Sequence, residues 1–249
     1  MLGILPVHRG VLSDVTDDGN LDLCIIFVDT EGVASLNVHA HNGGYSLLPP
    51  SLSIPTVVPN ALARRDLNGD GRIDFVMTSD AAQQLITYLS TADQGIAEST
   101  PVRIPISGNA GRLLLGGLED LDLDGGADAV MTVQGQNSLL VVRREPKGDW
   151  VRPIDLPFAD AGPEISLGNL DRDGAVEASA INPSGSELPL LWGFGAGNFA
   201  LASTVALPSP GTEALMADLN QDDQLDVVVN SMQGGCGLLL LMGDGASGA

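Results

Sequence analysis

The chain has 249 residues, of which 32 are acidic and 11 basic, giving a formal net charge of −21. So strong a negative charge repels phosphate backbones, and binding to nucleic acid is therefore not expected. Hydrophobic residues make up 44% of the chain and charged residues only 17%, which favours a folded domain over an acidic disordered tail. No apolar run approaches the length of a membrane-spanning helix, so no membrane span is expected.

An acidic nine-residue motif recurs five times along the chain. Its copies begin at Asp14, Asp66, Asp120, Asn169 and Asp218, which places consecutive copies 49 to 54 residues apart. A period near 50 residues is typical of the blades of β-propellers. We number the five copies in chain order and the positions within each copy from one to nine.

Two short apolar segments follow each acidic motif, and turn-forming residues separate them. In chain order, the expected strand pairs are Leu21–Val28 with Ala34–His39, Ile73–Thr78 with Leu85–Leu89, Ala127–Val133 with Ser138–Val142, Val176–Ile181 with Leu188–Phe194, and Leu225–Asn230 with Gly237–Met242. Short strands at regular intervals indicate all-β structure. The sequence therefore predicts a single β-propeller domain over residues 1–249, with about five four-stranded blades.

The two ends of the chain together supply close to one further repeat. Residues 218–249 are shorter than a full repeat, and Ile4-Leu5-Pro6 is similar to Ala206-Leu207-Pro208 before the last acidic motif. We therefore expect the N-terminal strand to complete the last blade and close a five-bladed ring. The alternative is that the chain is a segment of a larger ring.

The second acidic motif shows why these loops are candidate metal sites. Asp66, Asn68 and Asp70 occupy positions one, three and five, and Asp74 occupies position nine. The backbone carbonyl of Arg72 at position seven adds a further oxygen. Hard oxygen ligands in such number suit Ca²⁺, which takes six to eight of them. The sequence therefore predicts up to five bound Ca²⁺ ions, one per repeat.

The other four copies carry oxygen-bearing side chains at the same positions. These are Asp14, Thr16, Asp18 and Asp22; Asp120, Asp122, Asp124 and Asp128; Asn169, Asp171, Asp173 and Glu177; and Asp218, Asn220, Asp222 and Asp226. We expect weaker binding in the fourth copy, and also in the fifth, where Asp223 replaces the glycine of position six. The competing interpretation is that these Asp-Gly motifs are ordinary turns.

These features resemble the FG-GAP/VCBS repeat family, whose calcium-binding blades also occur in the propellers of integrin α-subunits. The stretch Asp-Leu-Asn-Gly-Asp-Gly-Arg-Ile-Asp-Phe at 66–75 and the turn at 194–199 carry the resemblance. It implies that calcium loops join the first two strands of each blade on one face and that partners meet the opposite face. That face would include Thr30–Val33, Ser79–Gln84, Gln134–Asn137, Asn182–Glu187 and Ser231–Gly235.

No catalytic motif is evident, so the chain is not expected to be an enzyme. His39 and His41 could form a metal pair, but a solvated strand end is the simpler interpretation. Cys24 and Cys236 are expected to be buried free thiols, with a disulfide between the first and last blades as the alternative.

The sequence favours a non-catalytic protein-interaction, adhesion or assembly module that binds calcium. A glycan-binding propeller is the alternative, since some fungal lectins resemble this family. Because millimolar extracellular calcium fills even weak sites, an extracellular or periplasmic location is expected. The first residues do not resemble a signal peptide, which argues the other way.

Overall fold

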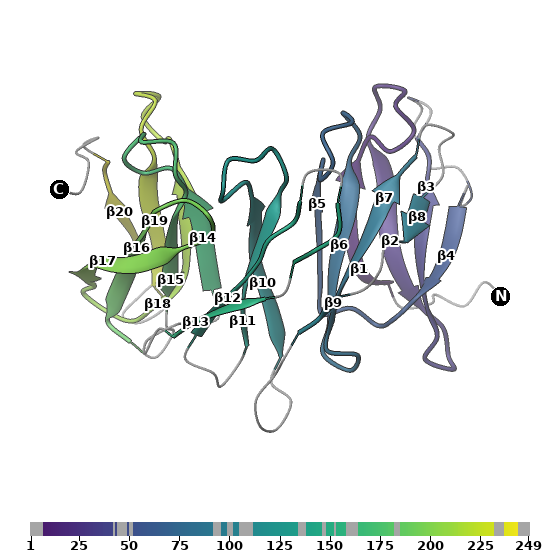
Figure 1. Cartoon of the computed structure of the whole chain (residues 1–249), viewed down its shortest axis with the longest axis horizontal. Helices are drawn as coiled ribbons and strands as arrows, with labels where there is room; N and C mark the ends of the chain where they lie inside the picture. The colour runs from purple at the N-terminus through teal and green to yellow at the C-terminus, as the bar shows by residue number, and fades with distance from the viewer. Residues whose placement is uncertain are drawn as a thin grey trace. The chain divides into compact units, whose positions relative to one another are not determined.

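The computed structural model describes residues 7–41, 43, 49, 52–91, 96–98, 102–104, 112–133, 138–145, 148–151, 153–157, 164–181, 185–231 and 237–243. Every regular element in these ranges is a β-strand, which confirms the predicted all-β class (Figure 1). No helix there is long and apolar enough to span a membrane. The chain divides into two compact units, residues 1–113 with 147–149, and residues 114–146 with 150–249.

The first unit contains two antiparallel sheets. The first sheet has the strand order β1 (Val7–Ser13), β2 (Asp22–Val28), β3 (Ala34–His39), β4 (Leu52–Thr56). The second sheet has the order β5 (Ala61–Arg65), β6 (Asp74–Ser79), β7 (Gln84–Ser90), β8 (Ile96–Glu98), and the short β9 (Val102–Arg103) also pairs with β7.

The second unit contains three further antiparallel sheets. The third sheet has the order β10 (Leu113–Glu119), β11 (Asp128–Val133), β12 (Ser138–Val142), β13 (Ile154–Pro157). The fourth has β14 (Glu164–Gly168), β15 (Glu177–Ile181), β16 (Glu187–Gly193), β17 (Phe199–Ala206). The fifth has three described strands, β18 (Gly211–Ala217), β19 (Asp226–Ser231), β20 (Gly237–Leu241).

Apolar side chains of consecutive sheets pack face to face within each unit. The contacts between the first two sheets join Cys24, Ile26, Leu36 and Val38 to Phe75, Met77, Ile86 and Tyr88. The third sheet packs in the same way on the fourth, and the fourth on the fifth. In β2 and β18 burial alternates along the strand, so every second side chain lies in one of these layers.

Two expectations depend on residues outside the described ranges. The closure of the last blade was assigned to residues 4–6, and Cys236 also lies outside those ranges. Cys24 is a fully buried free thiol, and its burial raises the pKa to about 12. Of the loops assigned to the partner-binding face, residues 30–33 and 79–84 are fully described.

Candidate metal sites

Each acidic motif forms the loop between the first two strands of one sheet. The loops connect β1 to β2, β5 to β6, β10 to β11, β14 to β15 and β18 to β19 (Figure 1). This is the placement that the family resemblance implied. We call them the first to fifth acidic loops, comprising residues 14–22, 66–74, 120–128, 169–177 and 218–226.

The aspartate at position one closes its own loop by accepting backbone hydrogen bonds. Asp66 Oδ2 accepts the N–H of Gly71 at 2.9 Å, and Asp66 Oδ1 accepts that of Gly69 at 2.8 Å. Asp14, Asp120 and Asp218 accept the corresponding bond from position six. The fourth loop differs, because its position-one oxygen, Asn169 Oδ1, is buried without a hydrogen-bond partner.

The carboxylate at position nine anchors each loop to the rest of its sheet. Asp74 Oδ2 accepts the N–H of Leu67 at 3.0 Å, and its Oδ1 accepts that of Ser90 at 2.8 Å. The same pair of bonds is made by Asp22 with Val15 and His41, by Asp128 with Leu121 and Arg144, by Glu177 with Leu170 and Gly193, and by Asp226 with Leu219 and Gly243. The carboxylate thus ties the loop's start to the end of the third strand.

Burial makes three of these anchoring carboxylates hard to ionise. Burial, the largest cause, raises the pKa of Asp74 to about 6 and that of Asp128 to about 7, with smaller contributions from neighbouring aspartates. Glu177 is raised to about 7 for the same leading reason. The backbone N–H groups that donate hydrogen bonds to each carboxylate lower its pKa. A cation close to these groups would favour their ionised form.

Acidic side chains converge in the third and fourth loops. Oxygen atoms of Asp120, Asp122 and Asp124 lie within 4.8 Å of one another, and so do those of Asp171, Asp173 and Glu177. In the other three loops, which are fully described, position three holds Thr16, Asn68 or Asn220. No group of three acidic side chains comes equally close there. The fourth loop, expected to be weak, is therefore one of the two with the densest acidic donors.

An arginine that the sequence analysis did not single out lies at the third loop. Arg143 Nη1 donates to Asp122 Oδ2 at 3.2 Å. Arg143 Nε and Asp122 Oδ1 are both buried without hydrogen-bond partners. Arg143 directly follows β12, so the hairpin of β11 and β12 brings it to the loop. Sequence spacing within the motif gives no sign of this contact.

A second arginine joins the fourth loop to the fifth. Arg172, at position four of the fourth loop, donates from Nε to the carbonyl of Asp223 and from Nη2 to that of Asp222, both at 2.9 Å. Arg172 itself has a backbone φ of 64°. The bonds place the backbone of one acidic loop directly against the next.

The left-handed backbone at position six agrees with the sequence, and that at position four was missed. Gly19, Gly71, Gly125 and Gly174 have φ between 82° and 95°, and Asp223, which stands in the place of glycine in the fifth loop, has φ 64°. Position four is also left-handed, at Asp17, Gly69, Leu123, Arg172 and Gln221. Four of these are not glycine, so the residue types gave no signal.

The histidine pair does not belong to either acidic cluster found in the described residues. His39 ends β3, paired with Leu23, and the backbone N–H of His41 donates to Asp22 Oδ1 at 2.9 Å. The structure therefore brings His41 to the first acidic loop through its backbone.

No protein-family model matches the chain, and no curated protein matches it. Several solved structures are similar in fold. A lectin from Agrocybe aegerita that recognises non-reducing terminal N-acetylglucosamine aligns with 96% of this chain and 68% of its own, at 17% identity and a TM-score of 0.64. The biofilm matrix protein Bap1 of V. cholerae aligns with 97% of this chain, which spans only 38% of that protein, at 18% identity and a TM-score of 0.58.

A third similar structure is the periplasmic gluconolactonase PpgL of Pseudomonas aeruginosa, with 15% identity, a TM-score of 0.58, and coverage of 95% of this chain and 57% of that one. These neighbours are propeller-like proteins, and the likeness shows the fold. The third neighbour also corrects one expectation. Because an enzyme shares this fold, the lack of a recognisable catalytic motif was no ground for predicting that the chain is not an enzyme.

Proposed function

We propose that this protein is a calcium-stabilised binding module whose five sheets are β-propeller blades of the FG-GAP/VCBS type. The observation that carries the proposal is the convergence of three acidic side chains in each of the third and fourth loops. Like charges so close together repel one another, and a cation among them would relieve that repulsion. Oxygen-only donor sets of this kind suit Ca²⁺.

Buried oxygen atoms without a hydrogen donor support the fit of a cation. Asp122 Oδ1 and Asn169 Oδ1 are such atoms, and they stand at position three of the third loop and position one of the fourth loop. A buried acceptor left unpaired is unfavourable, and a bound cation would satisfy it. The side chains of positions one, three, five and nine would hold the ion, with the carbonyl of position seven. Bound calcium would supply positive charge that offsets the net charge of −21.

Native mass spectrometry with and without calcium tests the proposal most directly. We expect bound calcium in the wild type and the loss of one ion in each of the variants Asp122→Asn and Asp171→Asn. Asp155→Asn is the matched control, because Asp155 lies on β13, outside every acidic loop, and is exposed. Calcium should also raise the melting temperature, since it binds only the folded chain. No bound ion and no change in melting would show that these loops are turns alone.

For the partner, we propose a protein that binds the loops opposite the acidic loops. Two of these loops are fully described, residues 30–33 between β2 and β3 and residues 79–84 at the β6–β7 turn. In the first, Asp29 Oδ1 accepts the N–H groups of Glu31 and Val33, which leaves Val33 55% exposed at a well-defined turn. Affinity capture with wild type and a Val33→Asp variant, in calcium and after its removal, tests the proposal.

A glycan ligand is the second candidate, favoured by the likeness to the N-acetylglucosamine-binding lectin. A glycan array that includes terminal N-acetylglucosamine tests it, and no binding in the presence of calcium would remove it. An extracellular or periplasmic location is proposed with either ligand. Weak calcium loops would be filled at the millimolar calcium found there.

A further inference from the structure

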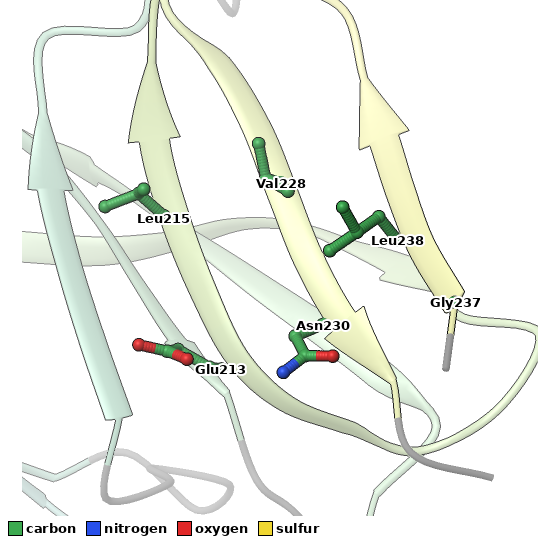
Figure 2. Close-up of a pocket in the computed structure, with 6 residues that line it drawn as sticks. All are labelled: Glu213, Leu215, Val228, Asn230, Gly237 and Leu238. Carbon is green, nitrogen blue, oxygen red and sulfur yellow. The ribbon is translucent and has the colours of Figure 1, made fainter. Parts of the chain in front are cut away.

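One face of the fifth sheet leaves several large apolar side chains exposed to solvent. Leu215 on β18 is 59% exposed, and Leu238 and Leu240 on β20 are 70% and 52% exposed. Leu215, Val228 and Leu238 border a groove of about 470 Å³, whose polar end carries Glu213 and Asn230 (Figure 2). The opposite face of this sheet packs on the fourth sheet through Ala214, Met216, Val227 and Val229.

The exposed leucine of β20 has a buried counterpart in every other repeat. In four repeats the leucine of the third strand pairs with the residue that stands at the same distance from the start of its acidic loop. These pairs are Leu36 with Ile26, Leu85 with Thr78, Leu139 with Thr132, and Leu238 with Asn230. Leu188 stands in the same register on β16. Leu36, Leu85, Leu139 and Leu188 are all 0% exposed, against 70% for Leu238. The fifth repeat thus keeps a core leucine at a position that is open to solvent.

The face that covers this leucine is known for three of the other repeats. Leu36 is covered by side chains of the second sheet, Leu139 belongs to the layer completed by the fourth sheet, and Leu188 is covered by the fifth. In the last case the covering side chains include Met216, Val227 and Val229, which come from the first two strands of the next sheet. By analogy, the uncovered face of the fifth sheet should pack against the first two strands of a further sheet.

The chain carries one such covering face that is itself open. In the first sheet, three residues stand at the repeat positions that Met216, Val227 and Val229 hold in the fifth sheet. They are Leu12, Leu23 and Ile25, and Leu12 pairs with Leu23 as Met216 pairs with Val227. Leu12 is 51% exposed, and Leu23 and Ile25 are partly exposed. Their neighbours Cys24 and Ile26 point to the other side and pack on the second sheet.

We propose that the exposed face of β18–β20 binds the β1–β2 face of a second copy of this chain. Such a contact is head-to-tail, because two different surfaces meet, and it continues the packing seen between consecutive sheets within each unit. Leu238 of one copy would be covered by Leu12, Leu23 and Ile25 of the other.

Light scattering coupled to size-exclusion chromatography tests this contact. We expect wild type at a multiple of its 25.7 kDa mass, and monomers for Leu238→Glu and for Leu12→Glu. An equimolar mixture of the two variants should form a dimer again, because each supplies the face that the other lacks. Leu201→Glu is the control, since Leu201 lies on β17 and is 55% exposed but outside both faces. Circular dichroism checks that each variant folds.

Two results would overturn the proposal. A monomeric wild type at high micromolar concentration would mean that no second copy covers Leu238, and would favour the closed five-bladed ring that the sequence predicts. An assembly that Leu238→Glu dissolves but Leu12→Glu leaves intact would mean that a different surface is the partner face.

Discussion

Arg143 Nη1 donates a hydrogen bond to Asp122 Oδ2 at 3.2 Å, so a fixed positive charge lies against the third acidic loop. A cation in that loop would have to bind beside this charge. We therefore predict that Arg143→Gln raises the calcium affinity of the third loop by about tenfold, the size expected for removing one like charge at close range in a partly buried site. Isothermal titration calorimetry measures the change.

Arg72→Gln is the matched control for that experiment. Arg72 Nη1 lies 3.6 Å from Asp70 Oδ2 at the second loop. The two arginines are about equally exposed, but the Asp70 side chain is 34% exposed against 14% for Asp122, so solvent screens the Arg72–Asp70 pair more strongly. The second loop should change its affinity less than the third. Equal changes in both variants would contradict a specific role for the Arg143–Asp122 pair.

The anchoring carboxylate of the third loop should matter for stability without any ion. Asp128→Ala removes the acceptor of the Leu121 and Arg144 N–H groups, both in buried hydrogen bonds. We predict a loss of about 3 kcal/mol in the free energy of unfolding, because two buried N–H donors lose their acceptor. Urea denaturation of calcium-depleted protein measures this loss. Asp124→Ala, in the same loop but exposed, should cost less than about 1 kcal/mol.

The calcium-depleted protein should be more stable in mild acid than at neutral pH. The folded-state pKa values of Asp74, Asp128 and Glu177 are raised to about 6, 7 and 7, above their unfolded values. The folded chain therefore binds more protons than the unfolded chain between about pH 4.5 and 7, and its stability falls as the pH rises through this window. Melting curves at about pH 5 and pH 7.5 measure the effect.

Calcium should weaken that trend, because it requires the ionised carboxylates. Asp128→Asn should also reduce the pH dependence, since an amide does not titrate in this range. A melting temperature of the depleted protein that climbs steadily from mild acid to neutrality would contradict the raised pKa values.

Asp223→Gly should stabilise the fifth loop. Asp223 has φ 64° where four other loops have glycine, and a non-glycine residue in this region costs about 1 kcal/mol. We expect a gain of about 0.5 kcal/mol, since glycine also loses more entropy on folding. Thermal denaturation measures it, and Gly174→Asp in the fourth loop should show the opposite sign. A destabilised Asp223→Gly would mean that its carboxylate makes a contact of its own.

The repeat made the strands and loops predictable, and the limits of that prediction are physical. Ala34–His39 is found as predicted, whereas β6 begins at Asp74, one residue later than the apolar pattern indicated. Ile73 is apolar but still belongs to the loop, because the buried carboxylate of Asp74 starts the strand. The spacing of acidic residues in the motif also could not show that the carboxylate at position nine anchors the loop through backbone hydrogen bonds. Arg143 reaches Asp122 only through a hairpin, which no local pattern records.

The two hydrogen bonds from Arg172 to the carbonyls of Asp222 and Asp223 join the fourth loop directly to the backbone of the fifth. A more ordered backbone in the fifth loop would hold the Arg172 guanidinium in place. Arg172 stands between Asp171 and Asp173, so their positions would be held as well. Coupling free energies between two sites are equal in both directions. Occupancy of one loop would therefore change the affinity of the other by the same factor in return, and these two repeats would respond to calcium as a pair.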